Sequence, residues 1–211
     1  VGTVQKEAAA KAWFEKASRL GNPHAQFQLA RMILSDPSSP GEEKKQALDW
    51  MKKSAEAENA YAQHYLGKLL FQGEIVNKDV KTAVHWLTAS AEQGNQYAQY
   101  ALGSLFLSGE DVPKDVEAAL KWLTQSAENG NEFAQYQLGR LFLRGEEISK
   151  DMETATRWLT ASAEQGNQYA QYALGRLLFS GEDVPKDVEA ALKWLTQSAE
   201  QGNEFAQYQL G

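Results

Sequence analysis

Apolar and small residues recur along the chain at three- and four-residue spacing, the pattern of amphipathic α-helices. The spacing predicts one helix over residues 95–108, called helix A, and a second from about Val116, called helix B. The apolar face expected for helix A comprises Ala98, Leu102, Leu105 and Phe106. The buried face expected for helix B comprises Ala119, Trp122, Leu123, Ser126 and Ala127. No alternating strand pattern occurs, so the sequence predicts an all-α chain.

The ends of these helices carry recognisable capping residues. Gly109 is expected to end helix A, and residues 109–114 are expected to form the loop that follows, since their composition is typical of loops. Asp115 then precedes helix B, where its side chain can accept hydrogen bonds from the free N–H groups of the first turn. Gly130 suits the left-handed conformation that closes a helix, and Asn131 is expected to cap the next helix A.

This two-helix unit repeats along the chain. Trp13, Trp50, Trp86, Trp122, Trp158 and Trp194 are spaced by 37 residues and then by 36, and such a period is typical of stacked arrays. Full repeats are predicted over residues 22–58, 59–94, 95–130, 131–166 and 167–202. Residues 1–21 form a half repeat with one helix B, and residues 203–211 begin a further helix A. The sequence therefore predicts about twelve helices in a single repeat array, a solenoid over residues 1–211.

Stacking of the repeats is expected to be obligatory because neither helix alone can bury two faces. Gly103 and Ala127 are small enough to let helix backbones approach closely. The tryptophan column is interpreted as core packing at the seams between repeats, since it lies beside Ala and Leu positions. A ladder of rings that stacks on a ligand is the alternative for this column.

Several positions recur in most units, in a fixed order. They are the AQYALG segment, Phe106, Gly109, Asp115, Ala119, Trp122, the Ser126 and Ala127 pair, and Gly130. This order resembles the Sel-1-like repeat family, which is similar to tetratricopeptide arrays. The first unit departs from the pattern, because Ala30 replaces the Gly, Asp36 replaces the loop Gly, and residues 35–45 are expected to form a longer loop.

The resemblance implies a right-handed superhelical solenoid of antiparallel helix pairs. It also implies a non-catalytic adaptor that presents helices A on a concave surface to other proteins. No catalytic residue and no cofactor come with the resemblance. Lactam binding or hydrolysis has been proposed for cysteine-rich relatives, but this chain has no Cys and no Ser followed three residues later by Lys. A further alternative is a targeting or interaction appendage of a larger bacterial enzyme.

Composition narrows the other classes of function. With 21 Lys and Arg against 28 Asp and Glu, the net charge of -7 argues against general nucleic-acid binding. No apolar run is long enough to cross a bilayer, so membrane insertion is not expected. His24, His64 and His85 have no partner at ligand spacing, and no metal site is predicted. The acidic pairs that begin at Glu110, Glu146 and Glu182 recur with the repeat near the starts of helices B. They are interpreted as surface residues that stabilise the helix dipoles and increase solubility, with no catalytic role.

Comparison of the units with one another locates a candidate binding surface. On helix A, one column of positions carries aromatic side chains and a neighbouring column carries cations, a composition favoured at interface hot spots. The predicted partner-binding residues are Tyr61, Lys68, Tyr97, Phe133, Arg140, Arg144, Tyr169 and Arg176. The expected partner is a protein or an extended peptide, acidic or amphipathic. Alternatively, these cations only solvate an exposed helix face while the rings complete the packing between repeats.

The two ends of the chain suggest a further interaction. Both terminal repeats are incomplete, so either the chain is a fragment of a longer array, which we favour, or copies associate head to tail. The chain begins with Val and not with Met, which agrees with the fragment interpretation. For the same reason, the lack of a signal peptide says nothing about export. The compartment stays open, with the cytoplasm favoured over export.

Overall fold

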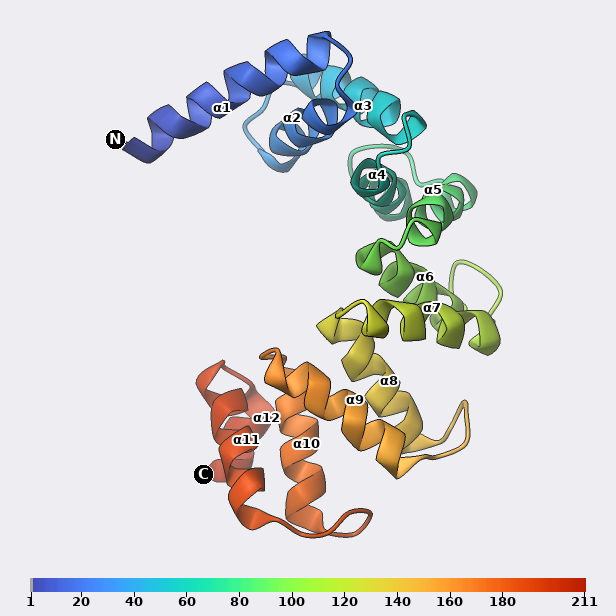
Figure 1. Ribbon diagram of the computed structural model, residues 1–211, viewed down its shortest axis with the longest axis vertical. Helices are drawn as coiled ribbons and strands as arrows, with labels where there is room; N and C mark the ends of the chain where they lie inside the picture. Colours follow the sequence, from blue (N-terminus) through green and yellow to red (C-terminus); the bar gives the residue numbers. More distant parts are fainter. Residues whose placement is uncertain (1) are drawn as a thin grey trace. The chain divides into compact units, whose positions relative to one another are not determined.

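A computed structural model describes residues 2–211, with side chains from residue 10 onward. This part of the chain forms twelve α-helices and contains no strand (Figure 1). The helices are α1 (Gly2–Arg19), α2 (Pro23–Ser35), α3 (Gly41–Glu56), α4 (Ala60–Gln72), α5 (Val80–Glu92), α6 (Gln96–Ser108), α7 (Val116–Glu128), α8 (Glu132–Arg144), α9 (Met152–Glu164), α10 (Gln168–Ser180), α11 (Val188–Glu200) and α12 (Glu204–Leu210). The all-helical prediction is confirmed, and even-numbered helices are helices A while odd-numbered helices are helices B.

The chain forms two compact units, one ending at Ala98 and one beginning at Gln99, within α6. In the first unit, α2 packs on α3 and α4 packs on α5 as antiparallel pairs. In the second unit, α8 packs on α9 and α10 packs on α11 in the same way. Within each unit, helices A also contact the helix B that precedes them, as α4 contacts α3, α8 contacts α7 and α10 contacts α9. Helix pairs therefore stack on one another within each unit, which is the organisation of an α-solenoid. None of the helices within residues 2–211 combines the length and apolar character that a bilayer crossing requires.

The predicted helix ends are confirmed. Asp115 Oδ1 accepts a hydrogen bond from the Ala118 N–H at 2.9 Å, and Asn131 Oδ1 accepts one from the Ala134 N–H at 2.9 Å. Gly130 has a φ of 89°, in the left-handed region that only glycine adopts without strain. Each cap satisfies backbone N–H groups that the first turn leaves without an intrahelical partner.

Close packing between helices depends on a glycine in the middle of helix A. A Cβ atom on Gly139 would lie 2.7 Å from Cγ of Leu159, closer than two carbon atoms can approach. Gly103 meets Leu123 in the same way, which confirms the expectation for that residue. In the first repeat Ala30 stands at this position, and the helix B residue at the equivalent place is Met51, which is fully buried with it. An unbranched Met side chain makes room for the Ala methyl group that a γ-branched Leu would exclude.

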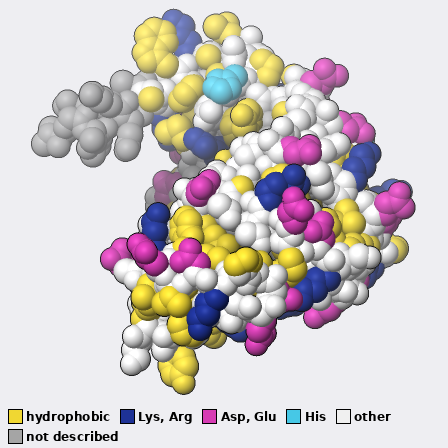
Figure 2. Space-filling model, turned by 60° about the horizontal axis from the view of Figure 1, so that its bottom comes forward, with side chains coloured by type: hydrophobic (Ala, Val, Ile, Leu, Met, Phe, Trp, Pro, Cys, Tyr) yellow, Lys and Arg dark blue, Asp and Glu magenta, His cyan; other side chains and the backbone are white. Residues whose placement is uncertain are grey.

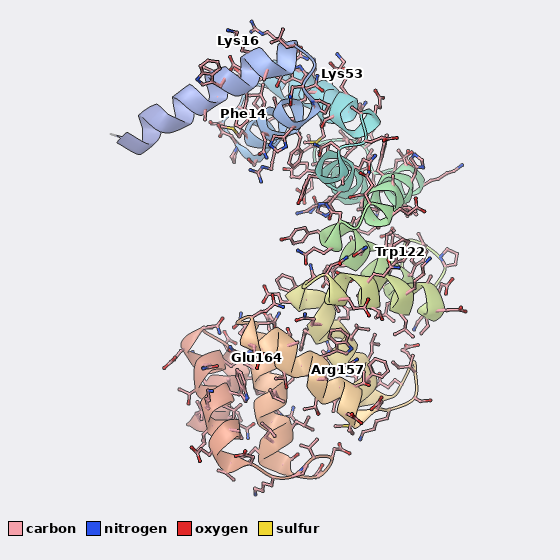
Figure 3. All side chains as sticks on the ribbon, viewed as in Figure 1. Phe14, Lys16, Lys53, Trp122, Arg157 and Glu164 are labelled. Atoms are coloured by element: carbon pink, nitrogen blue, oxygen red, sulfur yellow. The ribbon has the colours of Figure 1, made fainter. Side chains whose placement is uncertain are left out.

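The tryptophans are less buried than predicted. Five of the six indoles are half-buried at the edge of the core, where Trp158 packs against the cluster of Leu123, Ala127, Ala134 and Leu138. Trp13 is 71% exposed, so the expectation that it is buried is wrong. The later indoles pack against the two helices that precede their own, as Trp158 of α9 does against α7 and α8. Figure 3 labels one of the half-buried indoles, Trp122 on α7, and also Arg157 on α9, whose guanidinium carbon lies 5.0 Å from the ring centroid of Trp158.

The predicted longer loop over residues 35–45 is also wrong. α2 extends to Ser35 and α3 begins at Gly41, so residues 36–40 alone connect them. Pro40 precedes the helix, where its missing N–H costs no hydrogen bond. Glu42 and Glu43 lie in the first turn of α3 and stabilise the positive end of its dipole. The extra sequence of the first repeat therefore lengthens helix B.

Candidate functional site

Aromatic rings of successive helices A pair with one another. Each pair joins a ring in the second turn of one helix A to the exposed ring in the first turn of the next, and we call the five pairs the ring ladder. In the first unit these are Phe27 with Tyr61 at 6.1 Å and His64 with Tyr97 at 6.0 Å between centroids. In the second unit they are Tyr100 with Phe133 at 6.1 Å, Tyr136 with Tyr169 at 6.0 Å and Tyr172 with Phe205 at 5.9 Å. Centroid distances of this size are typical of favourable aromatic pairs.

The first-turn rings keep much of their surface in solvent. The exposed fraction is 57% for Tyr61, 50% for Tyr97, 47% for Phe133 and 50% for Tyr169. The packing alternative is therefore only part of the description, because each ring uses one face for the ladder and leaves the rest accessible. Exposed aromatic side chains at a fixed spacing are suited to contacts with another molecule.

Cations lie over the second-turn rings of the ladder. The guanidinium carbon of Arg140 is 5.5 Å from the centroid of Tyr136, and that of Arg176 is 5.7 Å from Tyr172. Arg31 stands 5.8 Å over Phe27 in the first unit. In each case the cation follows the ring by four residues, so both side chains share one helix face. Such cation–π contacts hold the guanidinium in place while its N–H groups stay available to a ligand.

The histidine of the ladder behaves as a neutral aromatic residue. Burial, together with a smaller effect of the nearby Lys68 ammonium, lowers the pKa of His64 from 6.5 to about 4. His64 is therefore uncharged at neutral pH, and Lys68 is the residue of α4 that occupies the cation position beside the ladder.

A small hollow opens beside the ladder in the second unit. It has a volume of about 180 Å³ and combines two apolar and two cationic side chains with a polar rim. Its lining is Leu107 of α6, Gln137, Arg140, Leu141 and Arg144 of α8, and Glu146 and Glu147 of the following loop. Arg144 Nη1 lies 3.9 Å from Glu146 Oε2, and Lys114 Nζ lies 2.5 Å from Glu147 Oε1.

The structure brings together most of the residues predicted for binding, through side chains that the sequence interpretation missed. Phe133 reaches Tyr100, and Arg140 reaches Tyr169 only through the intervening ring of Tyr136. The missed second-turn rings are Phe27, His64, Tyr100, Tyr136 and Tyr172. Their signal was present in the sequence as a second aromatic residue three positions after the first, with a cation four positions later in most units.

The acidic loop residues have a more specific arrangement than the one predicted. Lys150 Nζ lies 2.7 Å from Asp183 Oδ1, and Lys114 contacts Glu147 in the same way. A lysine at the end of one loop therefore pairs with an acid in the next loop, 33 residues later. Among the residues that the structure describes, no group of three or more His, Asp or Glu side chains is arranged to hold a metal ion. On the face drawn in Figure 2, apolar side chains alternate with charges of both signs.

The repeat pattern matches one protein family over nearly the whole chain. The Sel1 repeat profile matches residues 2–22, 23–59, 60–95, 96–131, 133–167 and 168–203. The chain belongs to the Sel1 repeat family. Comparison with curated protein sequences found no match.

Solved structures of Sel1 repeat proteins share this fold. A Sel1 repeat protein from Oxalobacter formigenes is 33% identical, with a TM-score of 0.86 over 95% of this chain and 58% of its own. A protective antigen of uropathogenic Escherichia coli strains with an SLR fold is 31% identical, with a TM-score of 0.86 over 94% of this chain and 42% of its own. The chain thus spans less than two thirds of the length of both. A Klebsiella pneumoniae protein described as a sel1 repeat protein is 21% identical with a TM-score of 0.60 over 94% of this chain and 96% of its own, and it shows the fold alone.

Proposed function

We propose that this Sel1 repeat chain is an interaction scaffold that binds an extended acidic segment of a partner protein along the ring ladder. Sel1 repeat proteins are generally protein-interaction scaffolds, and the surface of the helices A supports that role here. The observation that carries the proposal is the placement of Arg140 and Arg176 over ladder rings whose neighbours, Tyr169 and Phe205, are exposed.

The chemistry of this surface favours an acidic partner. Tyr and Arg are enriched among the residues that dominate binding energy at protein interfaces. The chain carries a net charge of -7, yet the column over the second-turn rings contains Arg31, Lys68, Arg140 and Arg176 and no acid. The charge of this column is therefore opposite to that of the chain, and it complements carboxylates.

The spacing of the cations favours an extended partner. Neighbouring packed helices lie about 8–10 Å apart, so the adjacent helices α8 and α10 present Arg140 and Arg176 roughly 10 Å apart. An extended chain advances about 3.3 Å per residue, so acids about three residues apart would meet successive cations. By resemblance to tetratricopeptide-like arrays, this surface is the concave one.

Fluorescence anisotropy with a labelled peptide tests the proposal. The probe is Gly-Thr-Val-Glu-Thr-Val-Glu-Thr-Gly-amide with fluorescein on its N-terminal amine, compared with the same labelled peptide in which Lys replaces both Glu. We expect saturable binding of the Glu peptide only, and loss of binding in the variant Arg140→Glu/Arg176→Glu. Equal binding of the two peptides, or unchanged binding by a folded double variant, would remove the proposal.

A further inference from the structure

We infer that the hollow on α8 is a specificity pocket that takes one glutamate side chain of the partner segment. The inference rests on the proposed function and goes beyond it, because it names one position in the partner and the residue that fits there. The hollow is unlike the rest of the ladder. Arg140 and Arg144 are four residues apart on one face of α8.

The pairing of two arginines is specific to this repeat. At the positions of Arg140 and Arg144, the other helices A carry Arg31 and Ser35, Lys68 and Gln72, Ser104 and Ser108, or Arg176 and Ser180. If these two positions served only to pack the repeats together, the repeat of α8 would not need a second arginine that the other repeats lack. Two guanidinium groups at one hollow can bind the two oxygens of a single carboxylate from both sides.

The size and the walls of the hollow suit glutamate. A volume of about 180 Å³ is roughly six times the share of one water molecule in the liquid, about 30 Å³, so it holds a single side chain. Leu107 and Leu141 provide apolar walls for a short hydrocarbon stem, while the two arginines meet its charged end. Glutamate has two methylene groups before its carboxylate and aspartate has one, so aspartate would reach the arginines less well.

The acids at the rim do not block such a ligand. Glu147 is paired with Lys114, which leaves its charge compensated. Glu146 approaches Arg144 at 3.9 Å, and both side chains are more than half exposed, at 69% and 54%. Exposed pairs of this length are weak. Within the described part of the chain, no carboxylate forms an ion pair with Arg140, which is held over Tyr136. Glu146 is thus a weak internal competitor for the partner's carboxylate.

Peptide binding by the full chain tests the inference. The labelled Glu peptide is compared with versions in which Asp or Gln replaces one Glu residue at a time, and the stronger of the two effects reports on the pocket position. At that position, we expect the Asp version to bind about fourfold more weakly, the effect of one methylene group left unburied. The Gln version is expected to lose about tenfold or more, because a neutral amide forms no charge-assisted hydrogen bonds.

Three variants locate the effect. Arg144→Gln is expected to weaken binding of the Glu peptide by about tenfold, and Glu146→Gln is expected to strengthen it by about two- to fivefold by removing the competitor. Arg157→Gln is the matched control, since Arg157 covers Trp158 on helix B at 5.0 Å and should leave binding unchanged. Circular dichroism confirms that each variant is folded.

The outcomes separate this inference from the proposed function. Equal affinity for Glu and Asp peptides, together with no effect of Arg144→Gln, would overturn the glutamate pocket while Arg140→Glu/Arg176→Glu still abolished binding. If the unmodified chain bound none of the peptides, both the glutamate pocket and the proposed function would be overturned. Tighter binding by Glu146→Gln and weaker binding by Arg144→Gln would support the pocket directly.

Discussion

The side-chain amide of Gln201 donates a hydrogen bond to the side-chain oxygen of Gln171 at 2.8 Å. Gln171 in turn donates to the Ala163 carbonyl at 3.1 Å, in the last turn of α9. That carbonyl also accepts a hydrogen bond from the Gly166 N–H at 3.0 Å, so the Gln171 amide is an additional donor at the end of α9. The same arrangement recurs where Gln165 donates to Gln135, which donates to the Ala127 carbonyl. This glutamine relay ties the ends of successive helices B to the helix A between them.

Replacing Gln171 with Leu is expected to destabilise the protein by about 1–3 kcal/mol, because its hydrogen bonds with Gln201 and with the Ala163 carbonyl are both lost, at about 0.5–1.5 kcal/mol each. Gln171 is only 4% exposed, so water does not substitute for it. Gln209→Leu, at an exposed position of α12, is the control and should change stability little. Urea unfolding followed by circular dichroism measures both, and equal effects would show that the relay contributes nothing.

Gly139→Ala is expected to cost about 1–3 kcal/mol because the added methyl group overpacks the contact with Leu159. The first repeat already contains the compensation, in the form of Ala30 packed with Met51. The double variant Gly139→Ala/Leu159→Met should therefore recover most of the lost stability in thermal unfolding. A double variant less stable than Gly139→Ala would contradict this explanation.

Trp158→Ala is expected to destabilise the protein by about 2–4 kcal/mol, less than a fully buried indole would because its edge is already in solvent. Trp13→Ala should change stability by no more than about 0.5 kcal/mol, as at other exposed positions. Denaturant unfolding of the two variants compares them directly. Similar losses would mean that the indoles contribute through something other than packing between helix pairs.

Most of the fold could be predicted because its determinants are local. Asp115 caps, Gly130 closes a helix and Gly103 allows close approach whatever the neighbouring repeats do, and all three follow from residue type and position. The depth of the tryptophans could not be predicted, since periodicity gives the face of a helix but not how far the next pair covers it. The short connection before Gly41 was missed because helix B extends backwards through residues whose composition resembles a loop.

The candidate site was predicted in part for a similar reason. The columns of Phe133 and Arg140 are visible in the sequence because they differ from the apolar stripe. The contact that joins them passes through Tyr136, whose position belongs to the half-buried edge of the stripe and was interpreted only as part of the repeat. The hollow beside Arg144 depends on Leu107 of another helix, and no spacing within one helix predicts that approach.

His64 makes stability depend on pH in mild acid. Its pKa is about 4 in the folded protein and near 6.5 when unfolded, so the unfolded state binds more protons between these values. Stability is therefore expected to fall as the pH is lowered from about 6.5 towards 4, by about 1–3 kcal/mol for this partly exposed ring. His64→Tyr places at this position the residue found in later repeats, as at Tyr100, and should remove that part of the dependence. Unfolding midpoints of both proteins measured at pH 7 and pH 5 provide the comparison.

The most direct test of partner binding on helices A is a titration of the ¹⁵N-labelled chain with the Glu peptide, followed by ¹H–¹⁵N NMR. All six tryptophans lie on helices B, so their indole N–H signals report on that surface separately. The account predicts shifts in the amides around Tyr136, Arg140, Tyr169 and Arg176, with the indole signals unmoved. Shifts of the indole signals of Trp158 and Trp194, with the amides of α8 and α10 unchanged, would contradict it.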